Sequence, residues 1–157
     1  VSHVLQARIG LRPGEMLQLH WEDRRPHWLA VPTRGEKRMA TITLGSRAGT
    51  KMRRRQWIAV DPMQDPIAAF VIGLSWYCTP GNQRLSPVRW TKGSNDLLRR
   101  ASIAWQVDRL RFTAHPARAG WATRLRMQGT PIAEVSERGR WVSDASLRSY
   151  LDIIGAV

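Results

Sequence analysis

Residues 139–150 read GRWVSDASLRSY, and this stretch decides how the rest of the chain is interpreted. It contains Trp141 and, nine positions later, Tyr150, one of only two tyrosines in the chain. A second motif, His115-Pro116-Ala117-Arg118, precedes it, and 23 positions separate Arg118 from Trp141. Histidine, arginine, tryptophan and tyrosine are therefore the candidate functional residues in this part of the chain.

A third motif lies near the N-terminus, where residues 10–15 read GLRPGE and contain Arg12. Pro13 suits the first turn of a helix, and Glu15 follows just inside that turn, where an acidic side chain is favoured by the helix dipole. We therefore interpret Glu15 as a structural partner within the motif.

The charge of the chain indicates a polyanionic partner. Among 157 residues there are 25 basic and 12 acidic side chains, which gives a formal net charge of +13. Lysine occurs only at Lys37, Lys51 and Lys92, so the positive charge is carried mainly by arginine, which grips phosphate oxygens in a bidentate way. Binding should depend strongly on salt. Charge alone is equally compatible with a ribosomal or architectural protein.

Composition narrows the class further. The single Cys78 excludes an internal disulfide, and no cysteine–histidine cluster indicates zinc. The longest apolar run, residues 67–78, is too short to span a bilayer, and no signal peptide is recognisable. We therefore expect an intracellular protein, in the cytoplasm, nucleoid or nucleus depending on its source.

Periodicity and turn signals predict an α+β domain, mainly helical with a small three-stranded antiparallel sheet near the N-terminus. The sequence predicts a helix from Pro13 to about Trp21, and strands over His27–Val31, Met39–Leu44 and Gln56–Val60. Three further helices are predicted over Ile67–Tyr77, from Ser94 or Asn95 to about Gln106, and over Pro116–Gln128. Two more follow: one has Thr130 as its cap and Pro131 as its first residue, and the last is capped by Ser143 or Asp144.

The order arginine, histidine-x-x-arginine, tryptophan and tyrosine resembles the catalytic domain of the tyrosine recombinase (phage integrase) family, over essentially all of residues 1–157. The resemblance implies an enzyme that cuts one DNA strand, holds a 3′-phosphotyrosine and passes that end to a partner duplex. It implies double-stranded DNA and a homo-oligomer on DNA, a tetramer, as partners, and neither metal nor nucleotide cofactor. Because relatives carry a helix and a separate DNA-clamping domain before this point, we expect the chain to be a fragment lacking that domain.

The resemblance assigns a role to each motif residue. Arg12 and Arg118 become clamps for the scissile phosphate, and Tyr150 the nucleophile. A phenol with a reference pKa of about 10 needs neighbouring cations to favour the phenolate. His115 would exchange a proton with the tyrosine or orient the phosphate. Trp141 stands where histidine is more common in the family; its indole N–H can only donate.

Lys51 is the candidate general acid, because family members place this lysine on the hairpin between the second and third strands. Lysine suits the role since its pKa drops readily near other cations. Arg47 and Arg53 are rivals for the same position, and a basic hairpin often only contacts the DNA backbone.

Two departures and two rival functions accompany this interpretation. Ala119 follows Arg118 where many relatives have histidine, and the chain ends seven residues after Tyr150, before the C-terminal helix that many relatives dock on a neighbouring protomer. A type IB topoisomerase is the weaker enzymatic rival, because Arg148 lies near the tyrosine where that family usually has lysine. A non-catalytic DNA-binding relic of a mobile element is the rival from another class.

Overall fold

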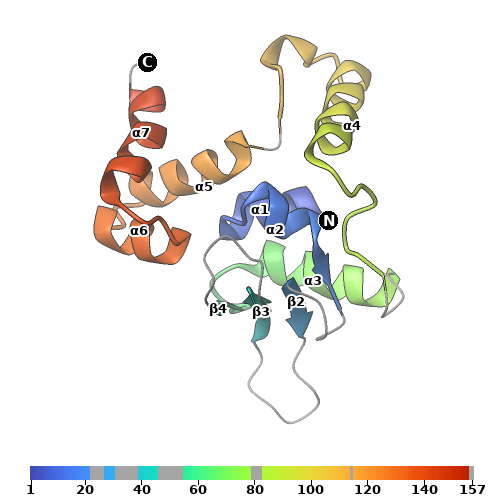
Figure 1. The fold of residues 1–157 in the computed structure, drawn as a ribbon, viewed down its shortest axis with the longest axis horizontal. Helices are drawn as coiled ribbons and strands as arrows, with labels where there is room; N and C mark the ends of the chain where they lie inside the picture. The colour runs from blue at the N-terminus through green and yellow to red at the C-terminus, as the bar shows by residue number, and fades with distance from the viewer. Residues whose placement is uncertain (22–26, 31–38, 46–54, 79–82, 114, 156–157) are drawn as a thin grey trace.

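The structure is a computed structural model that describes residues 1–21, 27–30, 39–45, 55–78, 83–113 and 115–155; for residues 27–28 and 152–155 only the backbone is described. The N-terminal half forms two short helices, α1 (Ser2–Ile9) and α2 (Pro13–Leu17), followed by a sheet (Figure 1). Its strands are β1 (Leu19–His20), β2 (His27–Ala30), β3 (Ala40–Leu44) and β4 (Gln56–Val60), in the order β1-β2-β3-β4.

The predicted antiparallel sheet is confirmed, and one short strand is added to it. β3 pairs antiparallel with β2 and β4, so that Ile42 lies opposite Leu29 and Ile58. β1 pairs parallel with β2, and the Leu19 carbonyl accepts from the Leu85 N–H. The helix predicted to continue to Trp21 therefore ends at Leu17, because the next residues place their backbone groups in the sheet and not in a further helical turn.

The C-terminal half is helical, as predicted. Its elements are α3 (Pro66–Cys78), α4 (Thr91–Ala104), the 3-10 helix η1 (Asp108–Leu110), α5 (Pro116–Met127), α6 (Ile132–Gly139) and α7 (Asp144–Gly155). Ser143 caps α7, since its Oγ accepts from the Ser146 N–H at 3.3 Å. Two helix starts differ from prediction: Pro131 is the N-cap of α6 and not its first residue, and α4 begins at Thr91, three residues before Ser94.

Ser94 does not cap α4 because it is buried inside the helix, where its Oγ lies 2.7 Å from His3 Nε2 of α1.

The buried side chains form two separate clusters. The N-terminal cluster joins α1, α2, the sheet, α3 and Leu85, with Leu5, Leu11 and Ile42 fully buried. The C-terminal cluster joins α5, α6 and α7 through four buried residues: Trp121, Ala122, Val135 and Leu147. Helix α5 lies between α1 on one side and α6 and α7 on the other (Figure 1). The junction of the two clusters therefore lies along α5.

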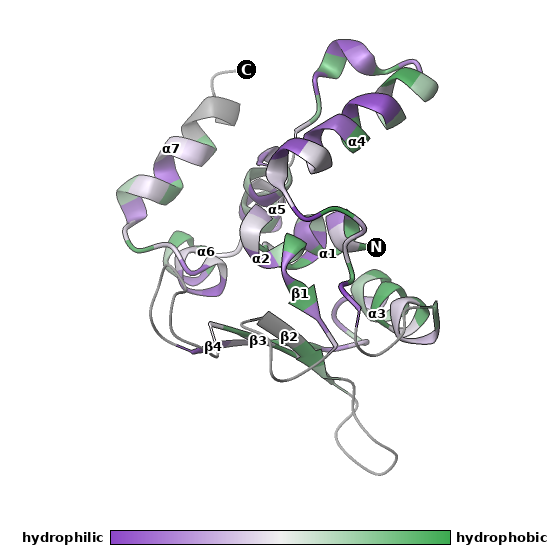
Figure 2. Cartoon of the chain, turned by 45° about the vertical axis from the view of Figure 1, so that its right-hand side comes forward, coloured by the Kyte–Doolittle hydropathy of each residue, from purple (hydrophilic) through white to green (hydrophobic). Residues whose placement is uncertain are grey.

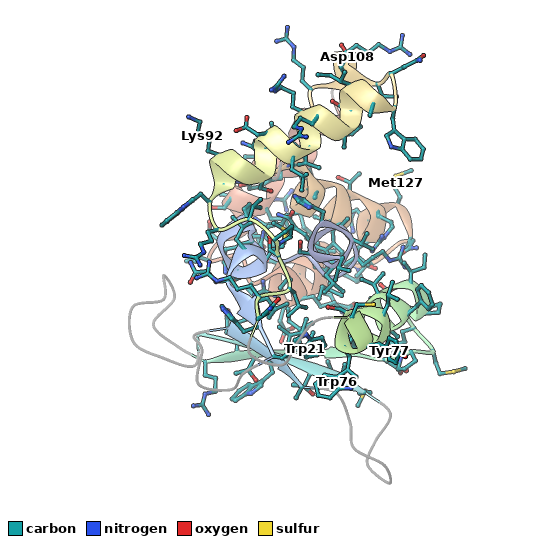
Figure 3. The ribbon with its side chains drawn as sticks, turned by 90° about the vertical axis from the view of Figure 1, so that its right-hand side faces the viewer. Trp21, Trp76, Tyr77, Lys92, Asp108 and Met127 are labelled. Atoms are coloured by element: carbon teal, nitrogen blue, oxygen red, sulfur yellow. The ribbon has the colours of Figure 1, made fainter. Side chains whose placement is uncertain are left out.

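Helix α3 is apolar on both of its sides. Ala68, Ile72 and Ser75 are buried in the N-terminal cluster, and Trp76 meets Trp21 edge-on with ring centroids 5.0 Å apart (Figure 3). On another face a stripe of large apolar side chains is exposed, and Figure 2 shows the helix mostly green. This apolar stripe consists of Ile67, Phe70, Leu74 and Tyr77. Among the described residues, no helix is both long and apolar enough to cross a membrane.

Candidate active site

Arg12 is positioned by the cap of α2. Its backbone is extended, Pro13 begins the helix, and the Glu15 carboxylate folds back to accept from the Arg12 N–H at 2.8 Å. This is the reciprocal half of a capping box, which satisfies an N–H that the helix itself cannot bind. The second carboxylate oxygen accepts from Arg12 Nη1 at 2.8 Å. Glu15 therefore binds both the backbone N–H and the guanidinium of Arg12, in the structural role predicted for it.

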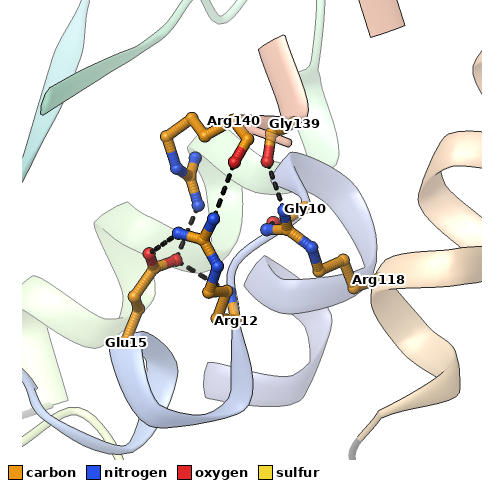
Figure 4. Close-up of polar contacts among 6 residues, drawn as sticks. All are labelled: Gly10, Arg12, Glu15, Arg118, Gly139 and Arg140. Carbon is orange, nitrogen blue, oxygen red and sulfur yellow. Dashed lines mark hydrogen bonds and ion pairs between the residues drawn. The ribbon is translucent and has the colours of Figure 1, made fainter. Parts of the chain in front are cut away.

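Arg118 lies in the first turn of α5 and is only 4% exposed. Its Nη1 donates to the Gly10 carbonyl at 2.7 Å and its Nη2 donates to the Gly139 carbonyl (Figure 4). Its Cζ lies 4.0 Å from the centroid of the Trp141 ring. A guanidinium over an indole face is a favourable cation–π arrangement. Arg118 therefore joins the N-terminal motif to the end of α6.

Two glycines make this arrangement possible. Gly10 has a φ of +69°, and a Cβ there would lie 2.7 Å from the Trp121 ring. A Cβ on Gly139 would lie 1.7 Å from the Trp141 ring. Because both residues lack a side chain, the Trp121 and Trp141 rings can pack directly against the two segments whose carbonyls accept from Arg118.

Burial, together with the neighbouring charges of Arg12 and Arg140, lowers the pKa of Arg118 to about 9, although Glu15 and Tyr150 act in the opposite direction. The guanidinium still carries its charge at neutral pH. Desolvation and like charges both disfavour that charge, so a bound anion would relieve the cost. The site is therefore electrostatically suited to an anion such as phosphate.

Arg140 is a residue of this site that the sequence did not single out. Its Nη2 lies 2.6 Å from Glu15 Oε2, and its carbonyl accepts from Arg12 Nη2 at 2.6 Å (Figure 4). Burial raises the pKa of Glu15, but Arg140 and Arg12 together lower it more, so the carboxylate is held ionised. The only signal was the place of Arg140 between Gly139 and Trp141 in one motif.

Tyr150, His115 and Trp141 form an aromatic group at the edge of the arginine cluster. The Tyr150 hydroxyl lies 3.3 Å from His115 Nε2, and the two rings are nearly parallel with centroids 5.5 Å apart. The Trp141 ring meets Tyr150 at a centroid distance of 6.0 Å and stacks on Trp121 at 6.1 Å. His115 is exposed and Tyr150 is half-buried, so a large substrate can reach the hydroxyl.

The structure thus brings five predicted site residues together: Arg12, His115, Arg118, Trp141 and Tyr150. Lys51, the candidate general acid, and its rivals Arg47 and Arg53 lie outside the described residues. Within the described ranges, no three histidine, cysteine or acidic side chains gather as a metal site would require. The assembled groups can bind an anion, present a phenol to it and move a proton between phenol and imidazole.

Comparison with solved structures shows a known fold. The chain is similar to the XerH site-specific recombinase bound to difH substrate in a pre-cleavage complex, with a TM-score of 0.63 and 17% identity over 96% of this chain and 41% of that one. The post-cleavage XerH complex gives 0.64 at 17% identity, covering 97% and 41%. The Tn1549 transposon integrase in complex with transposon right-end DNA gives 0.52 at 15%, covering 95% and 52%.

At these identities the likeness establishes the fold, and the chain spans about two fifths of the length of the XerH chain. The comparison with curated protein sequences found no match. A sequence profile described as the phage integrase family matches residues 4–154, nearly the whole chain. By that match, the chain belongs to the phage integrase family.

Proposed function

We propose that this chain is the catalytic domain of a site-specific DNA recombinase that cleaves and rejoins strands through a 3′-phosphotyrosine at Tyr150. The observation that carries the proposal is the placement of the Tyr150 hydroxyl 3.3 Å from His115 Nε2, beside the Arg118–Trp141 pair. The nucleophile that we propose, Tyr150, lies on α7, whereas the proposed proton acceptor His115 and the anion-binding Arg118 lie at the start of α5. Family membership favours the same chemistry.

In the proposed reaction, the Tyr150 oxygen attacks the scissile phosphorus and gives its proton to His115. The bond from phosphorus to the 5′ oxygen breaks, and that oxygen takes a proton from a general acid, the role we propose for Lys51. The phosphate ester passes from the DNA strand to the tyrosine, so no external energy source is required. Attack by a 5′ hydroxyl on the phosphotyrosine reverses these steps and rejoins the DNA.

The arginines would stabilise the charge that builds up on the phosphate oxygens in the transition state. Arg118 has N–H groups beyond the two that bind Gly10 and Gly139, and Arg12 is fixed beside it. Preorganised cations act most strongly where water is excluded, and Arg118 is buried. The Trp141 indole N–H would add one neutral donor to a phosphate oxygen.

The proposed partner is double-stranded DNA, on which the chain would act as a homo-oligomer, a tetramer by family resemblance. The net charge of +13 supports phosphate binding. The similar XerH recombinase was solved bound to difH substrate, and the similar Tn1549 integrase was solved in complex with transposon right-end DNA.

Covalent trapping tests the proposal. The chain would be incubated with a library of nicked, random-sequence duplexes that lose the leaving strand after cleavage, and a denaturant-stable protein–DNA adduct would be sought. We expect an adduct from the wild type and from Tyr77→Phe, and none from Tyr150→Phe. Tyr77 is a matched control because it is the other tyrosine and is exposed on α3.

An adduct that survives Tyr150→Phe would contradict the assignment of the nucleophile. Salt-sensitive DNA binding with no adduct from any duplex would favour the non-catalytic relic instead.

A further inference from the structure

We propose that Arg140 is a positioning residue that holds Arg12 in place for the scissile phosphate. The inference rests on the proposed function, and it adds a residue that acts on Arg12 by two separate routes. One route runs through the main chain of Arg140 and the other through its side chain and Glu15.

The main-chain route depends on an unusual backbone. Arg140 ends α6 in the left-handed conformation, with φ 59° and ψ 41°. The N–H groups of Arg140 and Trp141 turn back to the carbonyls of Glu137 and Ser136, which closes the helix. The carbonyl of Arg140 then accepts from Arg12 Nη2 at 2.6 Å. A residue with a side chain is strained in this conformation, and glycine is the usual choice.

The side-chain route depends on a buried charge. Arg140 is 7% exposed, and its Nη2 forms an ion pair with Glu15 at 2.6 Å. Its Nε and Nη1 are buried with no hydrogen-bond partner within the described part of the chain. A buried ion pair with unmatched donors is seldom better for stability than an apolar side chain of similar size. Strain and incomplete pairing at one residue therefore point to a functional role.

Both routes converge on the same guanidinium. Glu15 accepts from Arg12 Nη1 through one oxygen and from Arg140 Nη2 through the other, while Arg12 Nη2 binds the Arg140 carbonyl. The three charged groups carry a net charge of +1. Without the Arg140 side chain, Glu15 would neutralise Arg12 alone, and less positive charge would face the phosphate. Arg140 therefore keeps Arg12 both oriented and electrostatically available.

The test compares Arg140→Gly and Arg140→Met with Arg138→Met. Arg140→Gly keeps the left-handed backbone without strain and retains the carbonyl, so it removes the side-chain route alone and should fold. Arg138 is a matched control, because it makes an exposed ion pair with Glu134 at 2.6 Å on α6. Within the described part of the chain, no hydrogen bond or ion pair joins it to a site residue. Single-turnover adduct formation would be measured at saturating trapped duplex, together with the Kd for that DNA.

We expect both Arg140 variants to form the adduct about 10- to 100-fold more slowly, with Kd nearly unchanged, because misplacement of a catalytic group costs rate and not affinity. In an Arg12→Lys background the same substitutions should add little, since interacting residues are not additive. Arg138→Met should match the wild type. If the rate losses of the Arg140 variants and of Arg12→Lys multiplied fully in the double variants, the two residues would act independently and the proposal would be overturned.

A second measurement does not depend on activity. The guanidinium N–H signals of Arg12, assigned by their loss in Arg12→Lys, would be followed by NMR. In Arg140→Gly we expect them to broaden or exchange faster with solvent, and in Arg138→Met to stay unchanged. If the wild type forms no Tyr150-dependent adduct, the proposed function fails, and the Arg12 signals still decide the inference; signals unaltered by Arg140→Gly would overturn it.

Discussion

The two hydrophobic clusters differ both in size and in what they support. The N-terminal cluster contains fifteen buried residues and draws on α1, α2, the sheet and α3, whereas the C-terminal cluster contains four. Yet the elements around the smaller cluster, α5, the segment after α6, and α7, provide His115, Arg118, Trp141 and Tyr150, and those around the larger cluster provide only Arg12. Most of the candidate site is therefore positioned by helices that pack around the smaller hydrophobic cluster.

Bonds from arginine to main-chain carbonyls compensate for the small C-terminal cluster. Arg118 donates to Gly10, Arg12 donates to Arg140, and Arg124 donates to Arg8 at 3.0 Å, so each bond crosses between the two halves. Two of these three arginines are the proposed phosphate clamps. The same side chains are thus expected to join the clusters and to serve the chemistry.

The largest expected effect is that of Arg118→Ala, which tests the contribution of Arg118 to the reaction and to the stability of the fold separately. Arg118→Ala should slow adduct formation by about 10³- to 10⁵-fold, the scale seen when an arginine that stabilises a phosphoryl-transfer transition state is lost. It should also destabilise the fold by about 1 to 3 kcal/mol for each carbonyl left buried without a donor.

Arg124→Ala is its control, on the same helix and with the same kind of bond, outside the site. It should cost about 1 kcal/mol of unfolding free energy and leave adduct formation within a few-fold. Equal rate losses in both variants would mean that Arg118 acts only as a structural link.

A cavity-forming substitution in each cluster tests whether the C-terminal cluster is less stable to local unfolding than the N-terminal one. Leu147→Ala and Leu5→Ala each remove a fully buried side chain and should cost about 2 to 5 kcal/mol. Because few apolar contacts hold α7, we expect Leu147→Ala to speed amide hydrogen exchange in α5–α7 while β3 stays protected. Uniform acceleration in both halves would show that the clusters unfold as one unit.

The close approach at the junction should tolerate no side chain at Gly10. Gly10→Ala forces alanine into a left-handed conformation, which costs about 1 to 2 kcal/mol, and drives its Cβ against Trp121. Gly73→Ala, in open space on α3, should instead stabilise by about 0.5 to 1 kcal/mol. Thermal unfolding measures the change in stability of each variant. A Gly10→Ala variant as stable as the wild type would mean that Trp121 packs less closely against Gly10 than the contacts indicate.

The smallest expected effect concerns pH. The pKa of Glu15 is below its ordinary 4.5 in the folded chain, so its stabilising contribution is fully present above pH 4.5 and is lost as the pH falls through the lower folded value. In that acid window the unfolding free energy of the wild type should fall more steeply than that of Glu15→Gln, by up to about 1.4 kcal/mol per pH unit. Parallel pH profiles would show that Glu15 does not link the clusters electrostatically.

The sequence predicted the elements whose signals are local. Apolar alternation at Ala40–Leu44, the Ser143 cap and the proline at the start of α5 each depend on neighbouring residues, and each matches the structure. β1 could not be predicted in this way, because a two-residue strand exists only through its pairing with β2.

In the candidate site, too, residues whose role depends on distant contacts could not be predicted from the sequence. Motif spacing selected Arg12, Arg118 and Tyr150, and the structure brings them to one junction. Arg140 was missed because no local signal distinguishes it from the other arginines of the chain. In the structure Gly139 is the last helical residue, kept small by Trp141, and Arg140 takes the turn. The role proposed for Arg140 depends on its contacts with Glu15 and Arg12, which are distant in the sequence.

The apolar stripe on α3 affects how the isolated chain behaves in solution. The four side chains of the stripe and the exposed Trp76 share one helix that carries no charge, while the rest of the chain carries its large positive excess. At low ionic strength mutual repulsion opposes self-association, but at 0.1 M salt charges are screened beyond about 10 Å and the apolar attraction persists. A salt titration of DNA affinity would therefore report aggregation as well as counterion release, and light scattering at each salt concentration separates the two.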